Sequence, residues 1–239
     1  MANECTRPQV MENKIMATCQ NKCCEEEAVT SKLHPLGGEY CAECAIAKHK
    51  RNKSICGFGE DGIRDLLIEI GQNPDREGLI DTPMRVVKAM KEMTVGYKQS
   101  PKKILSKQFE GDDYDDLIIV RGIRFSSLCE HHLLPFVGNC AIGYLPRRKV
   151  VGLSKLPRLV ECYSKRLQLQ ERMTRQIADA VMNHLTPRGV GVYVQATHQC
   201  MACRGVRQPD ADMVTTTVLG EMRENPSLKS EFLEAVHHG

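Results

Sequence analysis

The order of patterns along the chain predicts an α+β protein in which helices precede and separate the strands of an antiparallel sheet. Two observations carry this prediction. Apolar residues repeat at helical spacing between about residues 59 and 96, and short apolar runs with the alternation of strands begin at residue 117. Later helical patterns fall between strand patterns, as in the α+β class.

Two helices are expected in the first part. One carries apolar residues at positions 63, 66, 67 and 70 and ends at Gly71–Pro74. The next begins at Asp81–Pro83, which provide an N-cap and an early proline, and ends at Gly96. The acidic stretch Glu110–Asp116 is expected to be a solvated loop.

The remaining patterns divide into strands and helices. Strands are expected at 117–125, 136–145, 190–197 and 214–219, with a turn at 146–149. Helices are expected at 156–166, 171–184 and 226–236.

Composition narrows the class of protein. The chain has 239 residues, of which 41% are hydrophobic and 26% charged, as in ordinary soluble globular proteins. No apolar run approaches the ~20 residues that cross a bilayer, and the first residues lack the apolar core of a secretory signal. A net charge of +3 is too small to indicate nucleic acid. We expect a cytoplasmic protein that binds neither membrane nor nucleic acid.

The twelve cysteines indicate a domain boundary, because seven of them lie in residues 5–56. Residues 1–56 are interpreted as an extension and 57–239 as the main domain, with a helical part at 57–110 and the sheet part at 111–239. A second, structural zinc is one hypothesis for the extension, with the ligands Cys19, Cys23, Cys41 and Cys44. A mobile tail with free thiols, or a segment for targeting or partner binding, are the alternatives.

Cys129, His132 and Cys200 form the strongest chemical pattern. Two thiolates and an imidazole suit zinc, and a catalytic zinc takes three protein ligands and keeps one position open. The alternatives are a structural zinc closed by Cys203, His131 or His198, and free thiols without metal.

His198 precedes Cys200 by two residues. Because residues i and i+2 of a strand point the same way, His198 is expected to project beside the metal, where it suits a general acid or base.

A second group of polar residues indicates an anion site. Ser154 and Lys155 begin a predicted helix, and Arg158 shares one helix face with Lys155. Arg204 can join them from another segment. A solvated basic face is the alternative, and Glu171 at the head of a helix is weak by itself because acidic residues favour that position. Together, metal ligands, cations and a carboxylate indicate an enzyme acting on a phosphorylated, nitrogen-rich small molecule.

Laid end to end, five motifs make residues 57–239 resemble the GTP cyclohydrolase I family. They occur in the family's order with compatible gaps, and they are Asp81–Lys88, Cys129–His132, Gly152–Arg158, Gln168–Arg172 and His198–Gly205. Residues 1–56 lie outside the resemblance.

The resemblance implies a tunnelling fold, in which helices back an antiparallel sheet behind a helical N-terminal part. Five subunits would close a ring, and two rings would form a toroidal homodecamer with active sites between subunits. It implies conversion of GTP and water to 7,8-dihydroneopterin triphosphate and formate, the entry to pterin and folate synthesis. It also implies allosteric control, with any regulatory protein unidentified.

The resemblance also implies roles for residues. One catalytic zinc per subunit would be held by Cys129, His132 and Cys200 and would activate water for attack on C8 of guanine. His198 would protonate N7, while His131 and Ser154 would assist the later sugar steps. Glu171 and Gln170 would recognise guanine. The triphosphate would be held by Lys155, Arg158 and Arg204, with Arg85 and Lys88 contributing.

Two alternatives concern loss of activity. Cys203 could take the fourth zinc position, or form a disulfide with Cys200, and silence the enzyme. The protein could also be a non-catalytic zinc scaffold or regulator of the same fold, although every residue expected at the site is present.

Overall fold

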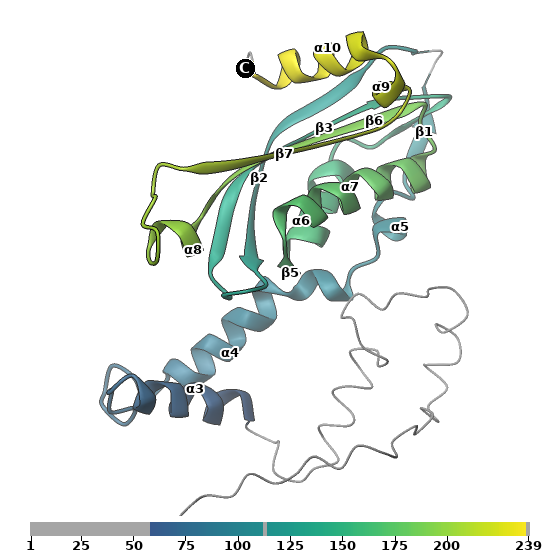
Figure 1. Ribbon diagram of the computed structural model, residues 1–239. Coiled ribbons are helices and arrows are strands. Elements are labelled where there is room, and N and C mark those ends of the chain that lie inside the picture. The colour runs from purple at the N-terminus through teal and green to yellow at the C-terminus, as the bar shows by residue number, and fades with distance from the viewer. Residues whose placement is uncertain (1–57, 112–113, 238–239) are drawn as a thin grey trace, which may run out of the picture. The chain divides into compact units, whose positions relative to one another are not determined.

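The computed structural model describes residues 58–111 and 114–237, and they form an α+β fold with a curled mixed sheet (Figure 1). The chain divides into two compact units, Met1–Pro83 and Met84–Gly239. The predicted boundary at residue 56, the extension and its four cysteine ligands lie outside the described residues. No helix of the described part is long and apolar enough to cross a membrane.

The first unit contains helix α3, Phe58–Glu69. The helix ends as predicted, because Gly71 has a φ of +82° and its amide donates to the carbonyl of Ile68. The apolar face predicted for α3 is largely exposed: Leu66 is 51% and Ile70 62% exposed. The predicted apolar face is therefore present on the helix, but most of it is exposed to solvent.

Helix α4, Thr82–Met93, begins at the predicted N-terminus and continues into the second unit. It is followed by two short helical turns, η1 at Val95–Lys98 and α5 at Pro101–Ile104. Ser100 caps α5, since its side chain accepts a hydrogen bond from the amide of Lys103.

A five-stranded sheet dominates the second unit, with strand order β5-β2-β3-β6-β7 (Figure 1). The strands are β2 (Ile118–Cys129), β3 (Pro135–Leu145), β5 (Leu167–Gln168), β6 (Gly189–His198) and β7 (Asp212–Gly220). All neighbours are antiparallel except β2 and β5. The sheet is therefore mixed, where the sequence predicted an antiparallel one. A separate antiparallel pair joins β1 (Gln108–Glu110) to β4 (Lys149–Val151).

The register brings three strand ends together. Phe136 pairs with His198, Leu128 with Pro135, and Cys129 with Gln168. The C-terminal ends of β2 and β6 and the start of β3 consequently lie at the same end of the sheet.

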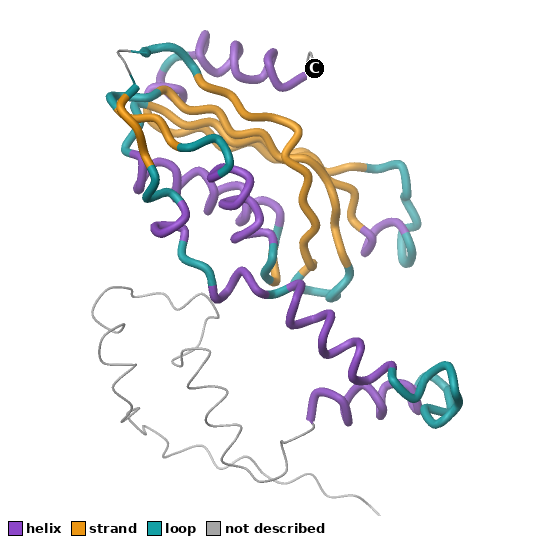
Figure 2. The backbone as a smooth tube through the Cα atoms, turned by 180° about the vertical axis from the view of Figure 1, so that it is seen from behind, coloured by secondary structure: helices purple, strands orange, loops and turns teal. Residues whose placement is uncertain are grey.

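One face of the sheet is covered by helices α6 (Lys155–Ser164) and α7 (Gln170–Leu185), as Figure 2 shows from behind. Their buried apolar residues form one core cluster with those of β2, β3 and β6. Leu159, Met173 and Ile177 come from the helices, and Phe136, Ile142 and Val192 from the sheet; all six side chains are fully buried.

The opposite face carries the short helix α9, Glu221–Glu224, and the C-terminal helix α10, Pro226–His237. Phe232 is fully buried there with Met222 and Ala141. Two glycines make room for its ring, since a Cβ at Gly143 would lie 2.7 Å from Phe232 and one at Gly191 would lie 2.9 Å from it. The glycines thus allow α10 to lie close to the sheet.

Most predicted elements are present with small shifts in their ends. The strand expected at 117–125 extends to Cys129, and the helix expected at 171–184 begins at Gln170. The short elements β1, β4, β5, η1, α5, α8 (Gln199–Ala202) and α9 were not predicted.

The close contact at Phe232 yields a stability prediction. Gly143→Ala should lower the free energy of unfolding by about 1–3 kcal/mol, because the methyl group overpacks a fully buried ring. Thermal or urea unfolding measures the change. Gly62→Ala in α3 is the control, since no atom lies within 4 Å of its added Cβ. Equal stability of Gly143→Ala and the parent protein would show that α10 is not tightly held.

Candidate functional site

Three predicted metal ligands lie together at the shared end of the sheet. One donor atom from each of Cys129, His132 and Cys200 lies within 4.8 Å of the other two. Cys129 Sγ and His132 Nδ1 are 3.7 Å apart. No fourth His, Cys, Asp or Glu of the described residues joins the group. Three ligands without a fourth are the pattern of a catalytic zinc site.

A single helical turn presents the first two donors. The carbonyl of Cys129 accepts from the amides of His132 and Leu133, and Leu133 has a left-handed φ of 54°. The chain then reverses into β3, where the amide of Cys129 donates to Leu134. This turn brings residues 129 and 132 to the same side, which explains the C-x-x-H spacing.

Cys200 lies in α8, a one-turn helix that begins directly after β6. The premise that His198 and Cys200 share a strand face is therefore wrong, because β6 ends at His198 and the backbone turns helical. Cys203 is exposed and lies outside the donor group, and its thiol donates to the Gln199 carbonyl at 2.9 Å.

Without a cation, the surroundings disfavour the thiolate form of Cys200 and the protonated form of His132. Burial raises the pKa of the Cys200 thiol, and the neighbouring Cys129 sulfur raises it further. Partial burial and the charge of Arg204 lower the pKa of His132 and favour its neutral, ligating form. A neutral imidazole beside two thiols that a cation can deprotonate fits zinc.

His198 has a well-defined setting next to this group. Its ring stacks on Phe136, with centroids 4.6 Å apart and planes 3° from parallel. Its Nε2 lies 2.8 Å from Gln170 Oε1. Burial lowers the pKa of His198, while the negative charge of nearby Glu171 opposes that shift. Glu171 thus acts electrostatically on His198.

The side chain of Gln170 is hydrogen-bonded inside the protein. It is 1% exposed and is held by β6, β7 and His198, whereas Glu171 next to it is exposed. Contact between Gln170 and guanine stays a prediction.

An ion pair that the sequence reading missed ties the metal turn to α7. Arg172 donates to Glu130, which stands between Cys129 and His131, and also to the side chain of Gln168. The amide of Glu130 donates to the Gln168 carbonyl. Both charged residues lie within the quoted motifs, and their opposite charges were the available signal.

The cations expected for the phosphates lie on several elements. Arg204 follows α8 and acts electrostatically on His132. Lys155 begins α6, with Ser154 at its N-cap, and Arg85 and Lys88 lie on α4. His131 is exposed, 3.9 Å from Glu130.

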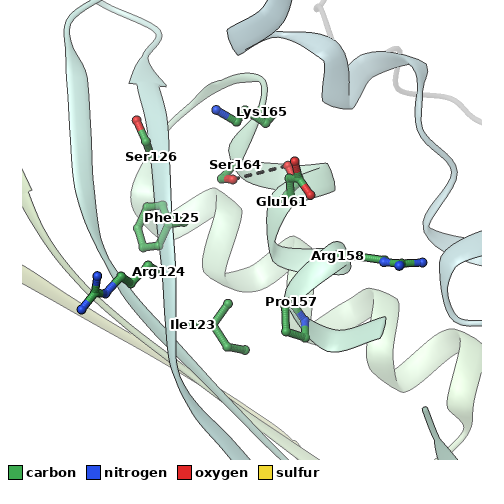
Figure 3. Close-up of a pocket in the computed structure, with 9 residues that line it drawn as sticks. All are labelled: Ile123, Arg124, Phe125, Ser126, Pro157, Arg158, Glu161, Ser164 and Lys165. Atoms are coloured by element: carbon green, nitrogen blue, oxygen red, sulfur yellow. Dashed lines mark hydrogen bonds between the residues drawn. The ribbon is translucent and has the colours of Figure 1, made fainter. Parts of the chain in front are cut away.

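Arg158 lines a pocket of about 390 Å³ between β2 and α6, together with Arg124, Phe125, Glu161 and Lys165 (Figure 3). None of the three metal donors lines this pocket. The structure therefore brings the three metal donors together, with His198 two residues from Cys200, and it places Arg158 in a pocket that none of the donors lines.

Comparison with known proteins identifies the family. A sequence model of GTP cyclohydrolase I matches residues 59–237. The chain belongs to the GTP cyclohydrolase I family. The matched range contains all five motifs and every candidate residue outside the extension.

Curated relatives agree with this assignment. GTP cyclohydrolase 1 of Chlorobaculum tepidum is 44% identical over 81% of this chain and 87% of its own length. The protein of the same name from Janthinobacterium is 53% identical over 74% and 89%. The human GTP cyclohydrolase 1 is 49% identical over 72% of this chain and 68% of its own length.

Among solved structures, an apo archaeosine synthase QueF-Like matches with a TM-score of 0.37 and 18% identity, over 44% of this chain and 93% of its own. This likeness is too distant to bear on function. The family assignment comes from the sequence relatives.

The three-donor group yields a metal-binding prediction. Cys129→Ser, His132→Ala and Cys200→Ser should each lower the zinc content by one ion per chain, because two remaining donors no longer form the site. Elemental analysis after dialysis measures the content. Cys203→Ser is the matched control and should keep the zinc. Loss of zinc in the control would make Cys203 a ligand and contradict the three-ligand assignment.

Proposed function

We propose that this protein converts GTP and water to 7,8-dihydroneopterin triphosphate and formate, with one catalytic zinc per subunit. The observation that supports this most directly is the convergence of three metal donors with His198 and Glu171 at one end of the sheet. Membership of the GTP cyclohydrolase I family adds the substrate. A metal-ligating set, an acid and a base-recognising carboxylate are the groups that opening a purine ring requires.

Guanine recognition falls to Glu171. It lies in the first turn of α7 and is exposed, so its carboxylate can accept two hydrogen bonds from N1–H and the exocyclic amine of guanine. Adenine lacks this pair of donors. The electrostatic influence of Glu171 on His198 supports the proposal that the recognised base lies near the acid.

Ring opening requires an activated water and a proton. A zinc ion bound by Cys129, His132 and Cys200 supplies Lewis-acid activation of water at neutral pH. His198 gives a proton to N7 as the imidazole ring of guanine opens. Phe136 holds the imidazole of His198 in one plane by stacking, which orients that proton.

Three cationic residues bind the triphosphate in this proposal, and two more contribute. The three are Lys155, Arg158 and Arg204, and the contributing residues are Arg85 and Lys88. Lys155 and Arg158 lie in the first turn of a ten-residue helix, where amides and side chains attract anions. Because none of the metal donors lines the Arg158 pocket, we propose that a neighbouring subunit supplies Arg158 to the site. His131 and Ser154 are assigned to the later sugar steps.

We propose assembly as a homodecamer of two pentameric rings, as the family resemblance implies. Strand β7 pairs only with β6 among the described strands and leaves a nine-residue edge open. Open edges of this length require a partner or protection, and pairing between copies would satisfy them. Cytoplasmic location stays an expectation from the sequence, and allosteric control one from the family resemblance.

The test of the function is product formation. The zinc-loaded protein should release formate and a pterin, fluorescent after oxidation, in equal amounts from GTP. Glu171→Gln should weaken discrimination against ATP, because an amide presents a donor where guanine also donates. Glu224→Gln, an exposed change in α9, is the control. Absence of formate from the unsubstituted protein would refute the proposal.

The phosphate assignment has its own test. Arg158→Ala should raise KM for GTP by about ten- to hundredfold, since a hydrogen bond to a charged group contributes ~1.5–3 kcal/mol. Binding of guanosine should change little, and Arg223→Ala should change neither. Equal losses for GTP and guanosine would show that Arg158 lies away from the triphosphate.

A further inference from the structure

We propose that Gln170 is a positioning residue, which holds His198 in the tautomer that carries its hydrogen on Nε2 and so leaves Nδ1 to exchange the proton with the substrate. The inference deepens the proposed function and rests on it for the role of His198 as acid. The hydrogen bonds that fix the tautomer are features of the fold and do not depend on substrate.

The orientation of the Gln170 amide is determined by its acceptors. Its Nε2 lies 3.2 Å from the Val194 carbonyl, 2.8 Å from the Met213 carbonyl and 3.2 Å from Thr215 Oγ1. Backbone carbonyls only accept hydrogen bonds, so the amide nitrogen must face them and the amide oxygen must point away. The side chain is 1% exposed, and the opposite orientation would leave two carbonyls facing an oxygen.

The hydroxyl groups of Thr174 and Thr215 can hydrogen-bond with this amide in only one donor–acceptor arrangement. Thr174 Oγ1 donates its single hydrogen to the Gln170 carbonyl at 2.7 Å. The 2.7 Å contact between Thr174 Oγ1 and Thr215 Oγ1 must therefore be donated by Thr215. Thr215 Oγ1 then has a lone pair toward Gln170 Nε2, whose two hydrogens are shared among this oxygen and the two carbonyls, which agrees with the orientation set by the carbonyls.

The amide oxygen then decides the state of His198. Gln170 Oε1 lies 2.8 Å from His198 Nε2, and an amide oxygen only accepts. His198 Nε2 must therefore carry a hydrogen whether the ring is neutral or protonated. In the neutral ring the lone pair is on Nδ1, and the stack on Phe136 favours the ring plane in which Nε2 faces Gln170 Oε1.

The consequence for the reaction is a fixed route for one proton. The imidazolium form of His198 gives the proton on Nδ1 to N7 of guanine, and the bonding pair of that N–H stays on Nδ1. The ring ends as the neutral Nε2–H tautomer, with its bond to Gln170 unchanged. Neither rotation of the ring nor a second proton transfer is needed.

Gln170→Met tests the inference, because methionine fills a similar volume but neither accepts from His198 nor donates to the carbonyls. In zinc-loaded full-length protein, kcat for GTP should fall by about 10- to 100-fold, part of what a positioned acid contributes. KM for GTP should change by less than about threefold, and the zinc content should not change. Thr216→Val, an exposed change at the next position of β7, is the matched control, and its kcat should stay near that of the unsubstituted protein.

A double-mutant cycle separates positioning from general support of the fold. In the His198→Ala background, Gln170→Met should lower kcat no further, because the group it positions is gone. The same loss in both backgrounds would overturn the inference and make Gln170 a purely structural residue.

Nitrogen NMR of the unsubstituted protein reads the tautomer without turnover. With ¹⁵N-labelled histidine, at about pH 8 where imidazole is neutral, the His198 signals are those missing from His198→Ala. We expect Nε2 to carry the hydrogen. Hydrogen on Nδ1 would overturn the inference even if GTP is converted. Failure to convert GTP with Nε2–H observed would refute the proposed function and keep the tautomer assignment.

Discussion

The register of strands β2, β3 and β6 is the constraint on which the site depends. It pairs Phe136 with His198 and ends β2 at Cys129, so residues distant in sequence meet at one end of the sheet. A slip of one residue would turn each of these side chains to the other face. The buried cluster between the sheet and helices α6 and α7 opposes such a slip, because it would expose that cluster's apolar residues.

The sequence was sufficient for long elements and insufficient for short ones. Helix α7 carries a periodic apolar pattern over sixteen residues, which arises from burial on one face, and the ten-residue strand β6 is an apolar run buried on both faces. Strand β5 has two residues and α8 has four, too few to display any period. The apolar face of α3 was recognised, but local periodicity cannot tell whether a face is covered within one chain.

The same distinction holds for the site. The spacing of Cys129 and His132 reveals a ligand pair because one turn of chain connects them, and Cys200 was found by its residue type. The setting of Gln170 was missed, since its partners on β6 and β7 meet it only through the fold. A residue's place in a motif indicates that it matters, and its burial and partners indicate what it contacts.

Strand β5 is joined to the sheet by two residue pairs, Leu128 with Leu167 and Cys129 with Gln168, whereas its neighbours form long ladders. A seam this short opens with a much smaller free energy than the sheet as a whole. The turn that carries Cys129 and the start of α7 therefore form a region that can open locally while the sheet stays folded. A metal bound by Cys129 at the end of β2 and by Cys200 in α8 would connect this region to a second element and stabilise it. Loss of the metal would then appear as faster amide hydrogen exchange around Glu130 and not as a collapse of the fold.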